Sequence, residues 1–165
     1  MPAQLKSATQ GETLILTLSN PGFRNALGPE IYASGIEALI AAEANPDIKS
    51  VILTGEGEHF CAGGNLNRLL DNRQRPPEVQ AQSIDNLHGW VQAIRTFPKP
   101  IIAAVEGACA GAGFSLVLTC DLLGPDNVLE TLFNLQTVYG DPRYRPSPWL
   151  RRRGAIGLSL KHRDA

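Results

Sequence analysis

The sequence is poor in charge, in sulfur and in long apolar runs, and each scarcity excludes a class of protein. Charged residues make up 19% of the 165 residues and the net charge is −1, so the chain lacks the basic excess typical of nucleic-acid-binding proteins. No stretch approaches the ~18 apolar residues of a membrane span, and the polar first ten residues lack the apolar core of a secretory signal. Three cysteines at irregular spacing predict no disulfide framework. We therefore expect a cytoplasmic protein that binds neither nucleic acid nor membrane.

What the sequence does contain is an alternation of helical and strand patterns. Hydrophobic residues reach 43%, which suits a packed globular core. The periodicity predicts strands at 13–19, 51–55 and 101–105, and helices at 29–44, 66–71, 79–96 and 114–119. The continuous apolar runs at 51–55 and 101–105 are typical of strands buried on both faces. This alternation predicts an α/β fold with a largely parallel sheet.

Two glycine-rich loops follow the second and third predicted strands. They are Ala62–Gly64 and Gly107–Gly113, and in a parallel sheet both would lie at the carboxyl ends of strands, where ligands bind. Two backbone N–H groups in such loops could stabilise negative charge on one oxygen, although close strand–helix packing would explain either loop alone. A dinucleotide loop of the form G-x-G-x-x-G is excluded because Leu116 occupies the last glycine position.

Three motifs in a fixed order carry a family resemblance. They are Asn20–Leu27 (NPGFRNAL), Phe60–Leu66 (FCAGGNL) and the stretch from Lys99 through Gly111–Gly113 to Asp121. Together they resemble the crotonase, or enoyl-CoA hydratase/isomerase, superfamily over residues 5–123. The resemblance implies a spiral of ββα units that binds an acyl-CoA thioester, with coenzyme A as part of the substrate and no separate cofactor or metal.

The resemblance also implies roles for individual residues. Two backbone N–H groups, those of Gly64 and Ala112, would form an oxyanion hole for the thioester carbonyl, although many relatives have glycine at the second position. The other positions matched to the family's substrate-binding pocket are Arg24, Ala26, Ala62, Asn65, Leu66 and Gly111.

The acid and base residues of the family are not matched. Ser115 occupies the position of a glutamate found in the family's hydratases, and a hydroxyl without help is no general base near neutral pH. The sequences of residues 16–33 and 62–70 are similar to those of oxepin-CoA hydrolase-type relatives, which act in aromatic-acid catabolism. Two hypotheses therefore stay open. The chain is an enzyme acting on an aromatic or fatty acyl-CoA, or a catalytically inactive fragment or chimera that binds acyl-CoA or associates with a full-length relative.

The last part of the sequence departs from the family pattern. Seven of the fifteen Lys and Arg residues fall between Arg143 and Arg163, and the segment resembles part of the C-terminal helical domain of 3-hydroxyacyl-CoA dehydrogenases. We predict two domains, an incomplete crotonase-like core at 1–123 and a short, basic α-helical tail at 124–165. The family region used in trimer assembly has no match here, while an exposed sheet edge would favour a homo-oligomer.

Other reactive side chains are predicted to be structural. His59 and Cys61 are two residues apart, but a metal site needs three or four ligands. We expect Cys109 and Cys120 to be buried apolar side chains, His88 to lie on a helix surface or in the core, and Asp121 to lie at a strand edge or turn. Glu106 ends a strand beside the second glycine loop and could reach the site.

Overall fold

The computed structural model describes residues 3–123. The chain divides into two compact units, 1–127 and 128–165, and the description concerns the first of them. The predicted helical tail at 124–165 lies outside the described residues, so it stays a prediction.

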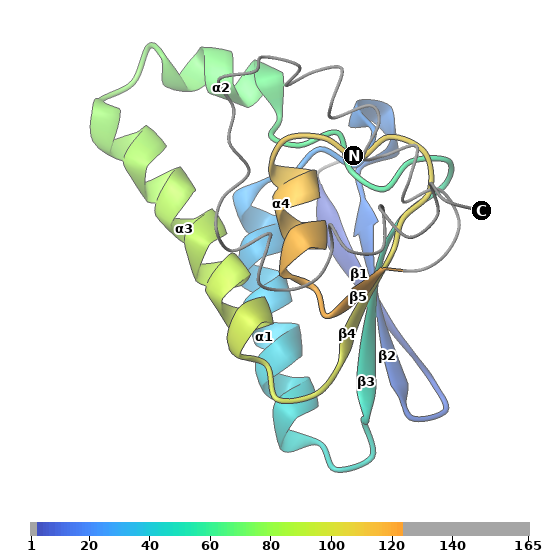
Figure 1. Ribbon diagram of the computed structural model, residues 1–165. Coiled ribbons are helices and arrows are strands. Elements are labelled where there is room, and N and C mark those ends of the chain that lie inside the picture. Colours follow the sequence, from blue (N-terminus) through green and yellow to red (C-terminus); the bar gives the residue numbers. More distant parts are fainter. Residues whose placement is uncertain (1–2, 124–165) are drawn as a thin grey trace, which may run out of the picture. The chain divides into compact units, whose positions relative to one another are not determined.

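The described strands form one sheet with helices packed against it (Figure 1). The elements are, in chain order, β1 (Gln4–Gln10), β2 (Thr13–Ser19), the 3-10 helix η1 (Pro21–Phe23), α1 (Pro29–Ala44), β3 (Ser50–Gly55), α2 (Leu66–Asn72), α3 (Pro77–Thr96), β4 (Ile101–Ala104), α4 (Ala112–Thr119) and β5 (Leu122–Leu123). Their order in the sheet follows their order in the chain. The strands from β2 to β5 run parallel and β1 pairs with β2 antiparallel, which confirms the predicted α/β fold.

The sheet buries one face more deeply than the other. Leu53 of β3 and Ala103 of β4 are paired residues with at most 1% exposure, and they pack in the core with the helices. The next residues along the same strands, Ile52 and Ile102, are only half-buried. The expectation that these strands are buried on both faces is therefore wrong, because the helices α1, α3 and α4 lie on one side of the sheet (Figure 1).

Helices α1 and α3 meet where a glycine faces a tryptophan. A Cβ atom added at Gly35 would collide with the indole ring of Trp90, so the small residue lets the two helices approach closely. Trp90 is fully buried and its ring lies 6.1 Å from that of Tyr32, measured between centroids. Within the described residues, the indole Nε1 has no hydrogen-bond partner.

Helix α1 begins and ends as its sequence predicts. Pro29 opens the helix, where its missing N–H costs little. At the other end, the Lys99 ammonium donates hydrogen bonds to the carbonyls of Ala42 and Asn45, at 2.5 and 2.7 Å.

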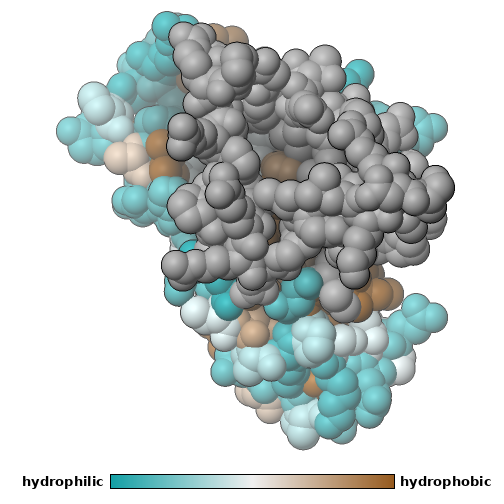
Figure 2. Space-filling view, in the orientation of Figure 1, coloured by the Kyte–Doolittle hydropathy of each residue, from teal (hydrophilic) through white to brown (hydrophobic). Residues whose placement is uncertain are grey.

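Where Figure 2 leaves the described residues visible, hydrophilic side chains dominate the surface at this end of the sheet and of α1. Among residues 3–123, no helix is both long enough and apolar enough to cross a bilayer.

Candidate functional site

Three loops at the carboxyl ends of neighbouring parallel strands build the candidate site. We call residues 20–28, 56–65 and 105–111 the first, second and third loops; they follow β2, β3 and β4. The Ala62 N–H donates to the Arg24 carbonyl at 2.9 Å, and the Leu27 N–H donates to the Gly63 carbonyl at 2.8 Å. The first and second predicted motifs are therefore joined by their backbones.

The second and third loops are joined in the same way. The Cys61 N–H donates to the Ala108 carbonyl at 3.0 Å, and the Ala110 N–H returns a bond to the Cys61 carbonyl at 2.9 Å. One step earlier, the Phe60 N–H donates to the Glu106 carbonyl at 2.7 Å. The three loops thus continue the β2-β3-β4 order of the sheet and bring both glycine loops together.

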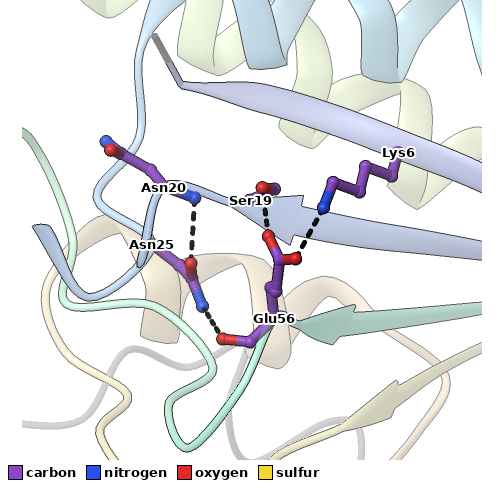
Figure 3. Close-up of polar contacts among 5 residues, drawn as sticks. All are labelled: Lys6, Ser19, Asn20, Asn25 and Glu56. Carbon is purple, nitrogen blue, oxygen red and sulfur yellow. Dashed lines mark hydrogen bonds and ion pairs between the residues drawn. The ribbon is translucent and has the colours of Figure 1, made fainter. Parts of the chain in front are cut away.

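The side chain of Asn25 holds the first loop in an unusual backbone conformation. Arg24 and Asn25 both have left-handed backbones, with φ of 49° and 57°, a region that asparagine tolerates better than most residues. The Asn25 amide nitrogen donates to the Glu56 carbonyl at 2.9 Å, and its oxygen accepts the Asn20 N–H at 3.0 Å (Figure 3). The same nitrogen also donates to the His59 carbonyl, at 2.7 Å. Because Asn25 is only 1% exposed, these bonds are shielded from water.

Glu56, the first residue of the second loop, connects the first loop to the outer strand of the sheet, because its carbonyl accepts the bond from Asn25. Its carboxylate accepts hydrogen bonds from Lys6 of β1, at 2.5 Å, and from the Ser19 hydroxyl of β2 (Figure 3). The bond from Lys6, followed by that from Ser19, holds the pKa of the Glu56 carboxyl below its ordinary value. The loop that presents Arg24 and Ala26 is therefore anchored from both β1 and β2.

Two glycines allow the second loop to touch the start of α4. Gly63 has φ of +100°, and a Cβ atom there would lie 2.9 Å from the Ala110 carbonyl oxygen and 3.5 Å from the Ala112 nitrogen. A Cβ atom at Gly113 would lie 2.6 Å from the carbonyl oxygen of Cys61 and 2.7 Å from its sulfur. A larger residue at either position would push the two segments apart.

The two predicted oxyanion donors lie on these touching segments. Gly64 follows Gly63 directly, and Ala112 is the first residue of α4; both are half-buried. Neither the Gly64 nor the Ala112 N–H donates a hydrogen bond to any other residue of the range 3–123. The N–H of Ala112 also lies at the positive end of the α4 dipole, so both groups are available to an oxygen atom.

The remaining predicted site residues lie in the three loops and at the start of α2, and they differ in exposure. Arg24 and Ala62 are exposed and joined by their backbones, whereas Ala26 is only 5% exposed. Asn65 caps α2, with its side-chain oxygen accepting the Arg68 N–H at 3.2 Å. Leu66 is 74% exposed. Gly111 caps α4, with φ of +52°.

A cavity of about 230 Å³ lies between the first loop and α2. Its lining is mixed, with the polar or charged residues Asn20, Glu30, Asn65 and Arg68 beside the apolar residues Ala3, Phe23, Leu27 and Pro29. Of the substrate-binding residues expected from the sequence, Asn65 alone belongs to its lining.

Beside the second donor, Ser115 is exposed and its hydroxyl donates to the Gly111 carbonyl at 3.3 Å. This bond ties the side chain to its own helix. Ser115 has no side-chain bond to a carboxylate or imidazole among the described residues, so nothing described there activates it as a base.

The three cysteines are free and buried, as predicted for Cys109 and Cys120. Burial raises the pKa of the Cys61 and Cys109 thiols to about 12, so they remain protonated and unsuited to nucleophilic attack. Residues 3–123 contain no group of three or more His, Cys, Asp or Glu side chains that could hold a metal ion.

The other candidate side chains have structural positions. The His59 ring nitrogen Nδ1 accepts the Ala108 N–H at 3.3 Å, and an Asp121 oxygen accepts the Ile101 N–H at 3.1 Å. His88 on α3 and Glu106 in the third loop are exposed. Sequence reasoning gave no role to Asn25 or Glu56, whose contacts become visible only when the loops are assembled.

Comparisons with known proteins agree with this arrangement. Residues 8–127 match the family model described as enoyl-CoA hydratase/isomerase. The crystal structure of an enoyl-CoA hydratase from Polaromonas sp. JS666 is 71% identical and superposes with a TM-score of 0.72, covering 73% of this chain and 47% of that one.

Curated relatives are more distant. The 1,2-epoxyphenylacetyl-CoA isomerase of Escherichia coli is 36% identical over 67% of this chain and 42% of its own length. The peroxisomal Delta(3,5)-Delta(2,4)-dienoyl-CoA isomerase of Arabidopsis thaliana is 32% identical over 72% of this chain and 46% of its own. The chain thus spans less than half the length of each of these relatives. With the matched family model and the three joined loops, these similarities show that the chain belongs to the enoyl-CoA hydratase/isomerase family.

Proposed function

We propose that residues 20–28, 56–66 and 105–115 form the thioester-binding part of a site that acts on an acyl-CoA. The carbonyl oxygen of the thioester would accept hydrogen bonds from the Gly64 and Ala112 N–H groups. As negative charge develops on that oxygen, both bonds strengthen, and this lowers the barrier to reaction at the neighbouring carbon atoms. The observation that carries the proposal is the pair of N–H groups without described partners on two segments in contact.

The surroundings of Gly64 favour an apolar acyl group. A Cβ atom at Gly64 would lie 3.8 Å from the Cδ1 methyl of Leu69, so the leucine side chain borders this donor. Leu66 and Leu70 of the same helix are 74% and 57% exposed, which extends the apolar surface along α2. Since the E. coli relative bears the name 1,2-epoxyphenylacetyl-CoA isomerase, we include thioesters from the breakdown of aromatic acids, oxepin-CoA-type substrates among them, beside fatty acyl ones.

Ser115 favours a second candidate function, in which this chain binds acyl-CoA without transforming it. Proton transfer at the substrate needs a group of suitable pKa within reach, and the Ser115 hydroxyl has no such partner among residues 3–123. Binding and polarisation of the carbonyl need only the two backbone donors. Both candidates share the same carbonyl site and differ in turnover.

A thermal melt of the whole chain with and without butyryl-CoA tests the shared site. At about 100 times its dissociation constant, a ligand that binds only the folded state adds roughly 2.7 kcal/mol of stability, which raises the melting temperature by several degrees. Free coenzyme A is the control for binding without a thioester carbonyl, and we expect a smaller shift with it. An assay of crotonyl-CoA hydration, monitored as the loss of absorbance of the conjugated thioester, then distinguishes the enzyme from the binding protein.

A single variant isolates the second donor. Ala112→Pro replaces this N–H with a ring methylene, which removes the donor and fills the space in front of it. We expect the helix to stay intact, because proline is favoured at the first helical position. Loss of one oxyanion donor typically lowers kcat by about 100- to 1000-fold. If the variant binds and converts thioesters as well as the natural chain does, the Ala112 N–H has no role and the proposal fails.

A further inference from the structure

Cys61 occupies the point at which the two segments carrying the proposed donors meet. Its side chain is fully buried, and its backbone is bonded to the third loop through both N–H and carbonyl, at 3.0 and 2.9 Å. Cys109 is its direct neighbour across this pairing. The side chain is therefore held on a rigid backbone and has little freedom to move.

On one side, the thiol closes the turn that leads to Gly64. The Gly63 N–H donates to the Cys61 sulfur at 3.4 Å, and the thiol lies 3.9 Å from the Gly63 carbonyl oxygen, to which it donates. That carbonyl also accepts the Leu27 N–H at 2.8 Å. The peptide units on both sides of Gly63 are thus fixed by contacts that include the thiol, and the second of these units carries the Gly64 N–H.

On the other side, the same residue is the surface on which α4 rests. Gly113 approaches Cys61 so closely that a Cβ atom on it would lie 2.7 Å from both the Cβ and the sulfur of Cys61. Gly113 is the residue directly after Ala112. Cys61 is therefore one residue removed from each donor, by contact with Gly63 and with Gly113.

We propose that Cys61 is a positioning residue that sets the separation between the Gly64 and Ala112 N–H groups. This inference rests on the proposed function. It assigns a side chain to a carbonyl-binding site whose donors are two backbone N–H groups. Oxyanion donors act only when they are held in the geometry of the transition state, so the size and bonding capacity of residue 61 control their effect. Because burial keeps the pKa of this thiol at about 12, its S–H proton is retained at neutral pH.

Three substitutions separate positioning from general packing. Cys61→Ala removes the partner of the Gly63 N–H, whereas Cys61→Ser keeps a donor and an acceptor at the same place. Cys120→Ala is the matched control, since Cys120 is also buried and its thiol donates to the Leu116 carbonyl at 3.3 Å near the far end of α4. Cys61→Val, which fills the space without a hydrogen-bonding atom, replaces Cys61→Ala if that variant does not fold.

The readout is the infrared stretching frequency of the thioester carbonyl in bound butyryl-CoA, which carries a carbon-13 label at that carbonyl. Hydrogen bonds from an oxyanion hole lower this frequency, and the measurement needs no turnover. We expect a downshift in the natural chain and in Cys120→Ala, a smaller one in Cys61→Ala, and recovery in Cys61→Ser. Where turnover is measurable, Cys61→Ala should lower kcat about tenfold and leave KM nearly unchanged, since the affected bonds act mainly in the transition state.

The outcomes distinguish the two proposals. If the natural chain shows no downshift, the proposed carbonyl site is absent and the role of Cys61 falls with it. If the natural chain shows the downshift and Cys61→Ala shows the same one, the carbonyl site stands and the positioning role is overturned. Equal losses in Cys61→Ala and Cys120→Ala would also overturn it, because they would reflect packing alone.

Discussion

Replacing Gly113 by alanine should destabilise the protein, although the same change usually stabilises a helix. Glycine inside a helix costs about 0.5–1 kcal/mol relative to alanine. At Gly113, however, the new methyl carbon would lie 2.6 Å from the Cys61 carbonyl oxygen and 2.7 Å from its sulfur. Since those atoms belong to a bonded, fully buried segment, the overpacking penalty of about 1–3 kcal/mol outweighs the helix gain. We expect a net loss of roughly 1 kcal/mol in the free energy of unfolding, within a range of about 0 to 2.5 kcal/mol.

The matched control is the same substitution at Gly89 in α3. There the added methyl carbon meets only the Cδ1 atom of Ile36, at 3.6 Å, which is an ordinary contact. Gly89→Ala should therefore stabilise the protein by about 0.5–1 kcal/mol. Urea unfolding of both variants measures the difference, and thermal melts should show shifts of opposite sign. If Gly113→Ala is as stable as Gly89→Ala, the close contact between α4 and Cys61 does not exist and the argument is refuted.

Three further predictions concern the loops and the thiols. Asn25→Ala should cost about 3 kcal/mol in urea unfolding, because it leaves two carbonyls and one N–H without partners. The bond from Lys6 lowers the folded-state pKa of Glu56, so its stabilisation is present above the ordinary glutamate pKa of about 4.3 and is lost as the pH falls through the lowered value. On acidification, the natural chain should therefore lose more stability than Glu56→Gln. Since burial raises the pKa of Cys61 and Cys109 to about 12, a thiol reagent at about pH 8 should label the cysteines only after denaturation.

Each of these predictions has a control or a contradicting result. Asn86→Ala removes an amide that is bonded to Gln82 in an exposed setting, and it should change stability by less than about 0.5 kcal/mol. Equal effects of Asn25→Ala and Asn86→Ala would show that the first loop is not clamped. Parallel stability profiles for the natural chain and Glu56→Gln across the acidic range would contradict the carboxylate bonds. Rapid labelling of any cysteine in the native protein would contradict its burial.

The sequence predicted the elements whose signals are local. Helix α1 runs from Pro29 to Ala44 as expected, because a proline opens it and Asn45 and Pro46 follow its end. Strand β1 was missed, since nearly all its residues are exposed and it lacks the alternation that marks a half-buried strand. The strand forms because all seven of its residues pair with β2. Backbone pairing of an exposed strand does not require alternating polar and apolar residues, so the sequence shows no strand pattern there.

The sequence indicated which loops form the candidate site, but it did not indicate the contacts that join them. The order of the three motifs indicated that the loops around Gly64 and Ala112 belong together, and the structure joins the loops that contain them. The roles of Asn25 and Cys61 depend in part on atoms 30 or more residues away in the chain, those of Glu56 and His59 for Asn25 and of Gly113 for Cys61. A lone asparagine or cysteine in a turn gives no sequence signal for such partners.

The contact between Gly35 and Trp90 gives the protein an internal optical probe. A fully buried indole whose N–H has no described partner should emit at short wavelength, and its emission should move to the red when water enters between α1 and α3. The sequence contains one other tryptophan, Trp149, which lies outside the described residues. In Trp149→Phe, the fluorescence of Trp90 alone would report the separation of these two helices.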